Sequence, residues 1–219
     1  RGVLLYGPPG TGKTHTARYL VGQALSATVI VLTGQGLSMI EPAAALARRH
    51  GLALHVDGAR LWNAAVHLGV SPARLLGGAD SASLCLSKGL AAPVGSVVVG
   101  SSEYIRKVRR HRKQVGGGMR QAGVIAAAGI VAVTTMVERL AQDHENARAL
   151  AEGLSALDGV SVDPAAVQTN IVIFELRRAD MTPVQLAARL KEHAVLLSPM
   201  DGNRLRAVTH YQVGEADID

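Results

Sequence analysis

Eight consecutive residues near the start of the chain have the types and spacing of a phosphate-binding loop. They read Gly7-Pro8-Pro9-Gly10-Thr11-Gly12-Lys13-Thr14 and fit the pattern G-x-x-x-x-G-K-[ST]. The glycines let backbone N–H groups turn inward and form an anion-binding nest where a helix begins. Lys13 would then reach the outer phosphates of a nucleotide, and Thr14 would bind Mg²⁺. An expected strand at 3–6 and an expected helix at 13–25 give the loop the context that the motif requires.

The wording of this loop and its flanks resembles the AAA+ ATPase family, from Leu5 through about residue 49. The resemblance implies ATP and Mg²⁺ as ligands of this segment. The family also places a glutamate after a later apolar strand, where it polarises the attacking water. Here Asp57 is followed by Gly58, and no sensor or arginine-finger segment is found downstream. We therefore expect that the loop binds a nucleotide and that hydrolysis is inefficient.

A second group of residues combines an acid, a guanidinium and an amine. Asp57 and Arg60 follow an expected strand at 52–56, and Lys88 follows an apolar segment at 83–86. Pyridoxal phosphate chemistry needs a lysine that holds the cofactor covalently and an acid that keeps the pyridine nitrogen protonated. Such a lysine should be only partly solvated, so that its amine is nucleophilic. Taken singly, an acid after a strand is more often a turn or helix cap, and a lysine there is more often solvated.

Four segments in order resemble the low-specificity L-threonine aldolase family, namely residues 55–65, 83–96, 116–121 and 204–210. The resemblance covers about residues 45–219. It implies a fold-type I pyridoxal phosphate enzyme that cleaves β-hydroxy-α-amino acids, such as threonine, to glycine and an aldehyde. It also implies a homo-oligomer whose site is built across a dimer interface. By this resemblance Lys88 is the aldimine lysine, and Asp57 pairs with the pyridine nitrogen.

Three arginines receive roles from the same resemblance. Arg60, beside the cofactor, and Arg206 would bind the substrate carboxylate, to which a guanidinium can donate two parallel hydrogen bonds. Arg120, on a glycine-rich turn, would lie near the cofactor phosphate or a neighbouring subunit. Arg206 could equally form an ion pair on a strand face, and Arg120 could simply cap a helix. His210 is either a proton donor or, more commonly for a strand histidine, structural.

The two resemblances meet within residues 45–52, which favours a chimera produced by gene fusion or by an artefact of sequence assembly. The aldolase family carries the ring that stacks on the pyridine and the turn that holds the phosphate in an N-terminal half, where this chain has the AAA+-like segment. Lyase activity is therefore expected to be impaired. Three hypotheses stay open: a pyridoxal phosphate lyase, complete or residual, an ATP-binding AAA+ module, and an inactive chimeric chain.

Alternating strand and helix patterns predict an α/β fold. The resemblance to threonine aldolases implies that its sheet is an incomplete, three-layer, mostly parallel one of the pyridoxal phosphate transferase type. A smaller C-terminal α+β domain follows. The expected domains are an AAA+-like fragment at 1–49, part of the cofactor-binding large domain at 50–135, and the small domain at 136–219. A helix at 119–140 includes the uncharged stretch 121–137, which we expect to be buried in a soluble protein. Further expected strands lie at 28–32, 94–99, 170–176, 195–199 and 205–209, and further helices at 41–50, 101–113, 143–157 and 182–193.

The composition of the chain excludes several classes of protein. Hydrophobic residues make up 48% of the 219 residues and charged residues 18%, which excludes global disorder. Aromatic residues make up 3%, which argues against nucleic-acid binding by base stacking. The net charge of +6 suits an anionic small ligand, and the basic run 106–113 fits a solvated helix face or a subunit contact better than a nucleic-acid site. The single cysteine, Cys85, and the absence of a signal-peptide or membrane-span pattern favour the cytoplasm.

Overall fold

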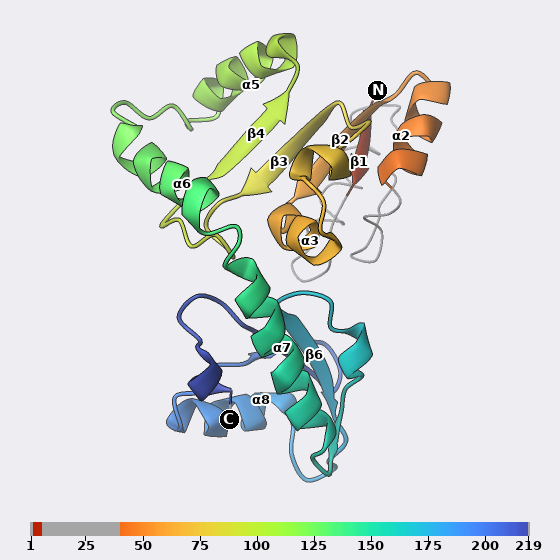
Figure 1. Cartoon of the computed structure of the whole chain (residues 1–219), viewed down its shortest axis with the longest axis vertical. Helices are drawn as coiled ribbons and strands as arrows, with labels where there is room; N and C mark the ends of the chain where they lie inside the picture. Colours follow the sequence, from red (N-terminus) through yellow and green to blue (C-terminus); the bar gives the residue numbers. More distant parts are fainter. Residues whose placement is uncertain (1, 6–39, 219) are drawn as a thin grey trace. The chain divides into compact units, whose positions relative to one another are not determined.

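A computed structural model describes residues 2–5 and 40–218 of the chain (Figure 1). They fall into two compact units, residues 1–137 and 138–219, called unit 1 and unit 2 below. Each unit has its own four-stranded sheet. The phosphate-binding motif 7–14, the expected helix 13–25 and the expected strand 28–32 lie outside the described residues.

Within the described residues, the sheet of unit 1 contains four strands in the order β1-β2-β3-β4. Strands β1 (Gly2–Leu5), β2 (Ala53–Gly58) and β3 (Ser81–Cys85) are parallel, and β4 (Ser96–Gly100) pairs antiparallel with β3. The register places His55 beside Ser81 and Asp57 beside Ser83. Because β2 and β3 run in the same direction, the residues that follow them leave the sheet at the same edge.

Strand β2 separates an apolar face of the sheet from a polar one. Leu54 and Val56 are buried, whereas His55 and Asp57, which alternate with them, are half-buried. The apolar face packs against α2 (Ile40–Arg49), whose alanines face the core, and against Leu61 at the start of α3 (Leu61–Leu68). The polar residues are therefore held on the opposite face by a strand that cannot shift by one residue without exposing its core side chains.

Gly58 ends β2 at a point where the backbone packs too closely for a side chain. A Cβ at this position would lie 2.8 Å from Leu84 Cδ2 and 3.3 Å from the Ser83 carbonyl oxygen. Gly58→Ala should therefore destabilise unit 1 by about 1–3 kcal/mol through overpacking. Denaturation followed by the fluorescence of Trp62, the chain's single tryptophan, measures this effect, because Trp62 packs against the same core. Gly123→Ala, where a Cβ meets no atom within 4 Å, is the matched control, and equal losses in both variants would contradict the packing argument.

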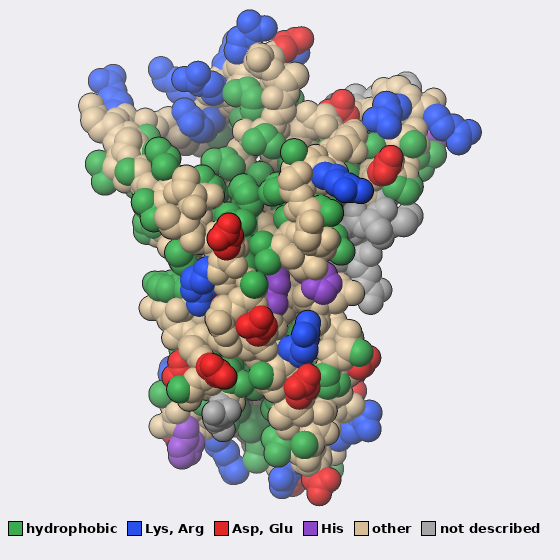
Figure 2. Space-filling model, in the orientation of Figure 1, with side chains coloured by type: hydrophobic (Ala, Val, Ile, Leu, Met, Phe, Trp, Pro, Cys, Tyr) green, Lys and Arg blue, Asp and Glu red, His purple; other side chains and the backbone are tan. Residues whose placement is uncertain are grey.

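Helix α5 (Ser102–Gln114) follows β4 and carries a dense positive charge. The side chain of Ser101 caps its first turn by accepting a hydrogen bond from the N–H of Tyr104. None of its residues is buried, and Lys and Arg side chains gather over it in Figure 2. Lys107 pairs with Glu103 at 2.7 Å, one turn away along the helix. The structure confirms that this basic helix is exposed. A contact with another subunit through α5 stays a prediction.

The uncharged stretch 121–137 departs from its prediction in two ways. It forms α6 (Gly123–Thr135) and then breaks, instead of running on as one helix from 119 to 140. The Thr134 and Thr135 hydroxyls bond back to carbonyl oxygens one turn earlier, which weakens a helix end. The expectation of burial is also wrong: only Gly129 and Ala132 of α6 are buried, and Val124 and Ile130 are largely exposed. The helix is apolar on all sides, and the described chain covers little of it.

Unit 2 is built on an antiparallel sheet in the order β5-β6-β8-β7. The strands are β5 (Val160–Ser161), β6 (Ile171–Leu176), β7 (Ser198–Pro199) and β8 (Arg204–Val208). Helix α7 (Leu140–Ser155) packs its alanines Ala147 and Ala151 on β6 and β8, and α8 (Pro183–Glu192) adds Leu186 to the same core. Short helical turns lie at Pro72–Leu75 (α4), Pro164–Ala166 (η2) and Glu215–Asp217 (η3).

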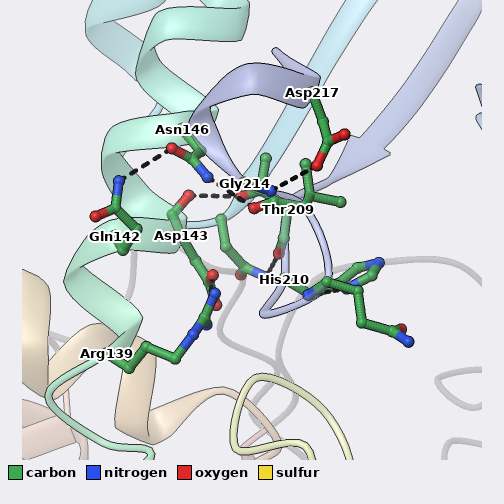
Figure 3. Close-up of polar contacts among 11 residues, drawn as sticks. Arg139, Gln142, Asp143, Asn146, Thr209, His210, Gly214 and Asp217 are labelled. Carbon is green, nitrogen blue, oxygen red and sulfur yellow. Dashed lines mark hydrogen bonds and ion pairs between the residues drawn. The ribbon is translucent and has the colours of Figure 1, made fainter.

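Polar groups tie the last residues of the chain to the start of α7 (Figure 3). The Thr209 hydroxyl donates to the Asp143 backbone carbonyl at 2.5 Å, and Asn146 Nδ2 donates to the Val213 carbonyl at 2.9 Å. The Asp143 carboxylate is fully buried and pairs through Oδ1 with Arg139 at 2.7 Å. Its other oxygen, Oδ2, is buried without a hydrogen-bond partner among the described residues.

The buried Asp143 carboxyl gives unit 2 a predictable dependence on pH. Burial raises the pKa of Asp143 above its usual value, although the Arg139 contact opposes this effect. A folded-state pKa above the unfolded one means that the folded chain binds the proton more tightly than the unfolded chain. At pH values below the ordinary Asp pKa, this group therefore stabilises unit 2, and the contribution is lost as the pH rises through the folded-state pKa. Asp143→Asn should therefore gain stability over the wild type at neutral pH, and the gain should shrink on acidification.

Fluorine-labelled Phe174 provides the measurement for this prediction. It is the only phenylalanine of the chain and is buried in the core of unit 2, so its ¹⁹F signal reports on the unfolding of this unit alone. A stability difference between Asp143→Asn and the wild type that stays constant from pH 7 to pH 4 would contradict the raised pKa.

Within the described residues, no single helix is long and apolar enough to cross a membrane; α6 and α7 meet the length and composition criterion only when they are counted together as one broken span.

Candidate functional site

The carboxyl end of β2 presents the acid and the arginine that the sequence singled out. Asp57 is the penultimate residue of β2 and is half-buried on the polar face of the sheet. Its carboxylate makes no hydrogen bond or ion pair within the part of the chain that the structure describes. Arg60 is half-buried in the turn that leads into α3, where it is the residue before the first helical position. The strand end thus presents a carboxylate and a guanidinium three residues apart.

Lys88 leaves the sheet beside this strand end. It lies three residues beyond the last residue of β3, which is the parallel neighbour of β2. Lys88 is exposed, which differs from the partial burial expected for a nucleophilic amine, and Gly89 and Leu90 behind it are buried. The structure therefore brings Asp57, Arg60 and Lys88 to one edge of one sheet, the edge where parallel α/β sheets bind ligands.

The thiol of Cys85 marks the polar surroundings at the end of β3. Its Sγ lies 3.5 Å from Ser87 Oγ and 4.0 Å from the Gly95 carbonyl oxygen. Burial raises the pKa of the Cys85 thiol, but hydrogen bonds from Ser87 and Ser96 and the charge of Lys88 together lower it below the usual value. The positive charge of Lys88 therefore favours the thiolate form of Cys85 at the end of β3. Cys85 itself is half-buried.

Sequence reasoning missed one polar pair on this face of the sheet. His55 Nδ1 and Ser81 Oγ lie 2.8 Å apart, and they occupy paired positions of β2 and β3. Burial lowers the pKa of His55, and the nearby Asp57 carboxylate opposes this effect. The sequence did indicate that His55 lies on the polar face of β2, since His55 and Asp57 are two residues apart and so share one face.

Two predicted arginines lie elsewhere in the structure. Arg120 is exposed in the loop between α5 and α6, next to Gln121, whose backbone has a positive φ of 47°. Arg206 belongs to unit 2, in the central strand β8, and its side chain alternates with the buried Leu205 and Ala207. Its Nε is buried and has no hydrogen-bond partner among the described residues. Because buried donors are normally paired, Arg206 has an unused capacity for an anion.

The remaining predicted sites are the nucleotide-binding loop, its metal ligand and His210. The nucleotide-binding residues 7–14, with the Mg²⁺ ligand Thr14, lie outside the described residues. Among the residues that the structure does describe, no group of three His, Cys, Asp or Glu side chains could hold a metal ion. His210 Nδ1 accepts a hydrogen bond from the Gln212 backbone N–H at 3.3 Å, a local turn contact.

Comparison with known proteins places the chain in a family. Residues 20–177, most of the chain, match the family described as beta-eliminating lyase. The chain belongs to the beta-eliminating lyase family. The matched region of the chain includes Asp57, Arg60, Lys88 and Arg120, and it begins after the motif 7–14.

Two relatives of the chain are named as threonine aldolases. The chain is 45% identical over 174 residues to low-specificity L-threonine aldolase 1 of Arabidopsis thaliana, covering 79% of this chain and 49% of that protein. It is 41% identical over 173 residues to the low specificity L-threonine aldolase of Escherichia coli strain K12, covering 78% and 49%. The chain thus spans about half the length of these relatives.

The fold of the chain also matches a solved structure. The crystal structure of a "putative L-allo-threonine aldolase" from Listeria monocytogenes superposes with a TM-score of 0.75 at 16% sequence identity, covering 99% of this chain and 70% of that chain. The α/β fold of the pyridoxal phosphate transferase type, with a smaller α+β part, is thereby confirmed.

Proposed function

We propose that the protein is a pyridoxal phosphate-dependent aldehyde-lyase of the threonine aldolase type, which cleaves β-hydroxy-α-amino acids to glycine and an aldehyde. The observation that carries the proposal is the meeting of Asp57 and Lys88 at one edge of the sheet, beside Arg60. Both the carboxylate and the amine lack hydrogen-bond and ion-pair partners among the described residues, as groups kept for a ligand would. Family membership and the 41–45% identity to threonine aldolases support the same activity.

The residues at this edge fit the cofactor by their chemistry. Lys88 would hold the cofactor covalently through Nζ, and the Asp57 carboxylate would accept a hydrogen bond from the protonated pyridine nitrogen. When bound, pyridoxal phosphate supplies an electron sink that lets the bond between Cα and Cβ of the amino acid break. Arg60 and Arg206 would hold the substrate carboxylate, for which the buried, unpartnered Nε of Arg206 is suited. Arg120 would face the cofactor phosphate or a neighbouring subunit.

Product analysis tests the proposal. The chain with added pyridoxal phosphate should convert L-threonine to glycine and acetaldehyde in equal amounts, and Asp57→Asn should strongly reduce the rate. Omission of the cofactor should reduce it to background. Equal rates with and without pyridoxal phosphate, or an Asp57→Asn variant as active as the wild type, would contradict the proposal.

We further propose assembly into a homo-oligomer. The exposed apolar side chains of α6, including Val124, Ile130 and Val131, support it, because such residues are commonly covered at subunit contacts. Light scattering after gel filtration gives the mass of the particle in solution.

A cytoplasmic location would suit the free Cys85 thiol.

A second proposal is nucleotide binding by the AAA+-like loop 7–14, separate from the lyase site. The full P-loop motif supports it. We expect no efficient hydrolysis, because the position of the family's glutamate is taken by Gly58, which is buried with no room for a side chain. A fluorescent ATP analogue with Mg²⁺ should bind to the wild type and not to Lys13→Ala. Mg²⁺-dependent hydrolysis well above background, lost in Lys13→Ala, would contradict the expectation.

A further inference from the structure

Two buried polar residues join the ends of neighbouring strands in unit 2. Asn170 immediately precedes β6, and Thr209 immediately follows β8. The Thr209 backbone N–H donates to the Asn170 carbonyl oxygen at 3.1 Å, and Asn170 Nδ2 donates to the Thr209 carbonyl oxygen at 2.8 Å. The two residues thus continue the pairing of β6 with β8 by one more step, through a side chain as well as through the backbone.

A third hydrogen bond fastens this end of β8 to the helix that packs on the sheet. The Thr209 hydroxyl donates to the backbone carbonyl oxygen of Asp143, in the first turn of α7, at 2.5 Å (Figure 3). The first two bonds act within the sheet and the third acts toward α7, so the end of β8 is restrained in two directions. These three bonds of Thr209, to Asn170 and to Asp143, are called the clamp below.

The polar groups of the clamp are not needed to fill the core. Asn170 and Thr209 are only 1% and 2% exposed, and a leucine and a valine of similar size would fill the same space. Burying an amide and a hydroxyl is costly unless both are hydrogen-bonded. A bonded polar pair in a core, by contrast, favours one geometry over others. The clamp is therefore suited to fixing the position of a strand end.

Arg206 lies on β8, three residues before Thr209. It stands between the buried Leu205 and Ala207, so its side chain leaves the sheet on the face opposite the core. At the other end of β8, the Leu176 N–H donates to the Asn203 carbonyl oxygen at 2.7 Å. Arg206 is therefore near the middle of a stretch of chain that is held at both ends. Its Nε has no hydrogen-bond partner among the described residues, so the strand determines where this nitrogen lies.

We propose that Thr209 is a positioning residue for Arg206: its three hydrogen bonds hold the end of β8, and with it the guanidinium that would bind a carboxylate. The carboxylate rests on the proposed function, whereas the restraint of Arg206 by Thr209 does not. The link between the two residues is the strand itself. A strand end without its bonds can twist, and a long side chain amplifies a small twist of its backbone. Recognition of a carboxylate by two parallel hydrogen bonds tolerates little misorientation of the guanidinium.

The first test measures Arg206 itself, without cofactor or substrate. The Nε–H signal of Arg206 is identified in ¹⁵N NMR spectra by its absence from Arg206→Lys, and its exchange with water is measured. Thr209→Val, which removes only the hydroxyl bond to α7, should speed this exchange about five-fold, the factor expected for one ordinary hydrogen bond. Thr209→Ser, which keeps the hydroxyl, should stay close to the wild type. Asn170→Leu, which removes the bond to the Thr209 carbonyl oxygen, is an independent perturbation and should also speed the exchange.

Ser155→Ala is the matched control for these variants. The Ser155 hydroxyl also donates to a backbone carbonyl oxygen in unit 2, that of Glu152 at 2.7 Å, but at the opposite end of α7. Its loss should leave the exchange of the Arg206 signal unchanged. All variants are compared under conditions in which ¹⁹F-labelled Phe174 shows that unit 2 is folded. Exchange in folded Thr209→Val and Asn170→Leu at the rate of the wild type would overturn the inference.

The second test measures whether the restraint matters for a carboxylate. Sodium acetate is the probe, and the shift of the Arg206 Nε–H signal is followed as acetate is added. Thr209→Val should need about five-fold more acetate for half-saturation than the wild type, whereas Thr209→Ser and Ser155→Ala should match the wild type. A merely structural role of Thr209 would lower the stability of unit 2 and leave the affinity of the folded chain for acetate unchanged.

The outcomes separate the inference from the proposed function. If acetate leaves the Arg206 signal of the wild type unchanged, the proposed role of Arg206 in carboxylate binding is wrong, and the exchange rates alone decide whether Thr209 positions Arg206. If the wild type binds acetate and folded Thr209→Val binds it equally well, the inference is overturned.

Discussion

Replacement of Lys88 by alanine should abolish borohydride-trapped pyridoxal phosphate labelling at limiting cofactor, whereas Lys191→Ala and Lys13→Ala should retain it. All exposed lysines react slowly with an aldehyde, but of the lysines that the structure describes only Lys88 follows a strand of the sheet edge where Asp57 presents a carboxylate without a hydrogen-bond or ion-pair partner among the described residues. Lys191 is exposed in the last turn of α8, in unit 2, and so measures non-specific reaction. Peptide mass spectrometry locates the adduct. Similar labelling of Lys88 and Lys191 in the wild type would remove Lys88 from the site.

Loss of the arginine partner of Asp143 should strongly destabilise unit 2. Arg139→Leu leaves a fully buried carboxylate without its cation, which costs about 3 kcal/mol, at the lower end for buried pairs because Arg139 is partly exposed. It also removes the guanidinium that lies 5.9 Å from the centre of the Tyr211 ring. Denaturation followed by ¹⁹F-labelled Phe174 should show this loss, while Trp62 fluorescence, which reports on unit 1, should not change.

Two further variants give this stability prediction its controls. The double variant Arg139→Leu/Asp143→Asn should recover much of the loss, because no buried charge is then left unpaired. Arg178→Leu breaks the exposed pair between Arg178 and Asp180 and should have little effect, since exposed ion pairs contribute little to stability. A double variant as unstable as Arg139→Leu alone would show that packing of the arginine, rather than charge, is what matters.

The sequence predicted best those elements whose pattern reflects a buried face. Strand β2 and helix α2 begin and end within two residues of their expected positions, because Leu54, Val56 and the alanines of α2 must face one core. Helix α3 was not predicted, although Leu61, Ala64 and Ala65 have helical spacing and are buried. It is only eight residues long, a length at which apolar spacing alone does not distinguish a helix from a strand.

Burial was harder to predict than secondary structure. The stretch 121–137 has the composition of a core helix, yet composition does not say what would cover it, and α6 is largely exposed. Lys88 likewise was expected to be partly buried from the chemistry of its proposed role and is exposed. Both failures have one cause: a residue's own type and spacing predict its element, whereas its burial depends on residues far away in the sequence.

Similar limits apply to the site. The edge shared by Asp57, Arg60 and Lys88 followed from two parallel strands, which a sequence pattern can indicate. The His55–Ser81 pair required the register of β2 against β3, which no local pattern gives. The buried Asp143 carboxyl also had no local signal, since acids in a helix normally face water, and its partners come from residue 139 and from the end of the chain.

The bonds that tie the end of the chain to α7 bear on how the protein is synthesised. Thr209 and Val213 contact residues 66 and 67 positions earlier in the chain. A ribosome adds residues in order, so α7 is synthesised long before these partners. Until then, Asp143 and Asn146 of α7 are exposed to solvent without the contacts that they make in the folded unit. β8, which closes the sheet against β6, arrives at nearly the same time as Thr209. Unit 2 should therefore complete its fold only after translation has passed residue 213, whereas β2, α3 and β3 of unit 1 can assemble earlier in synthesis.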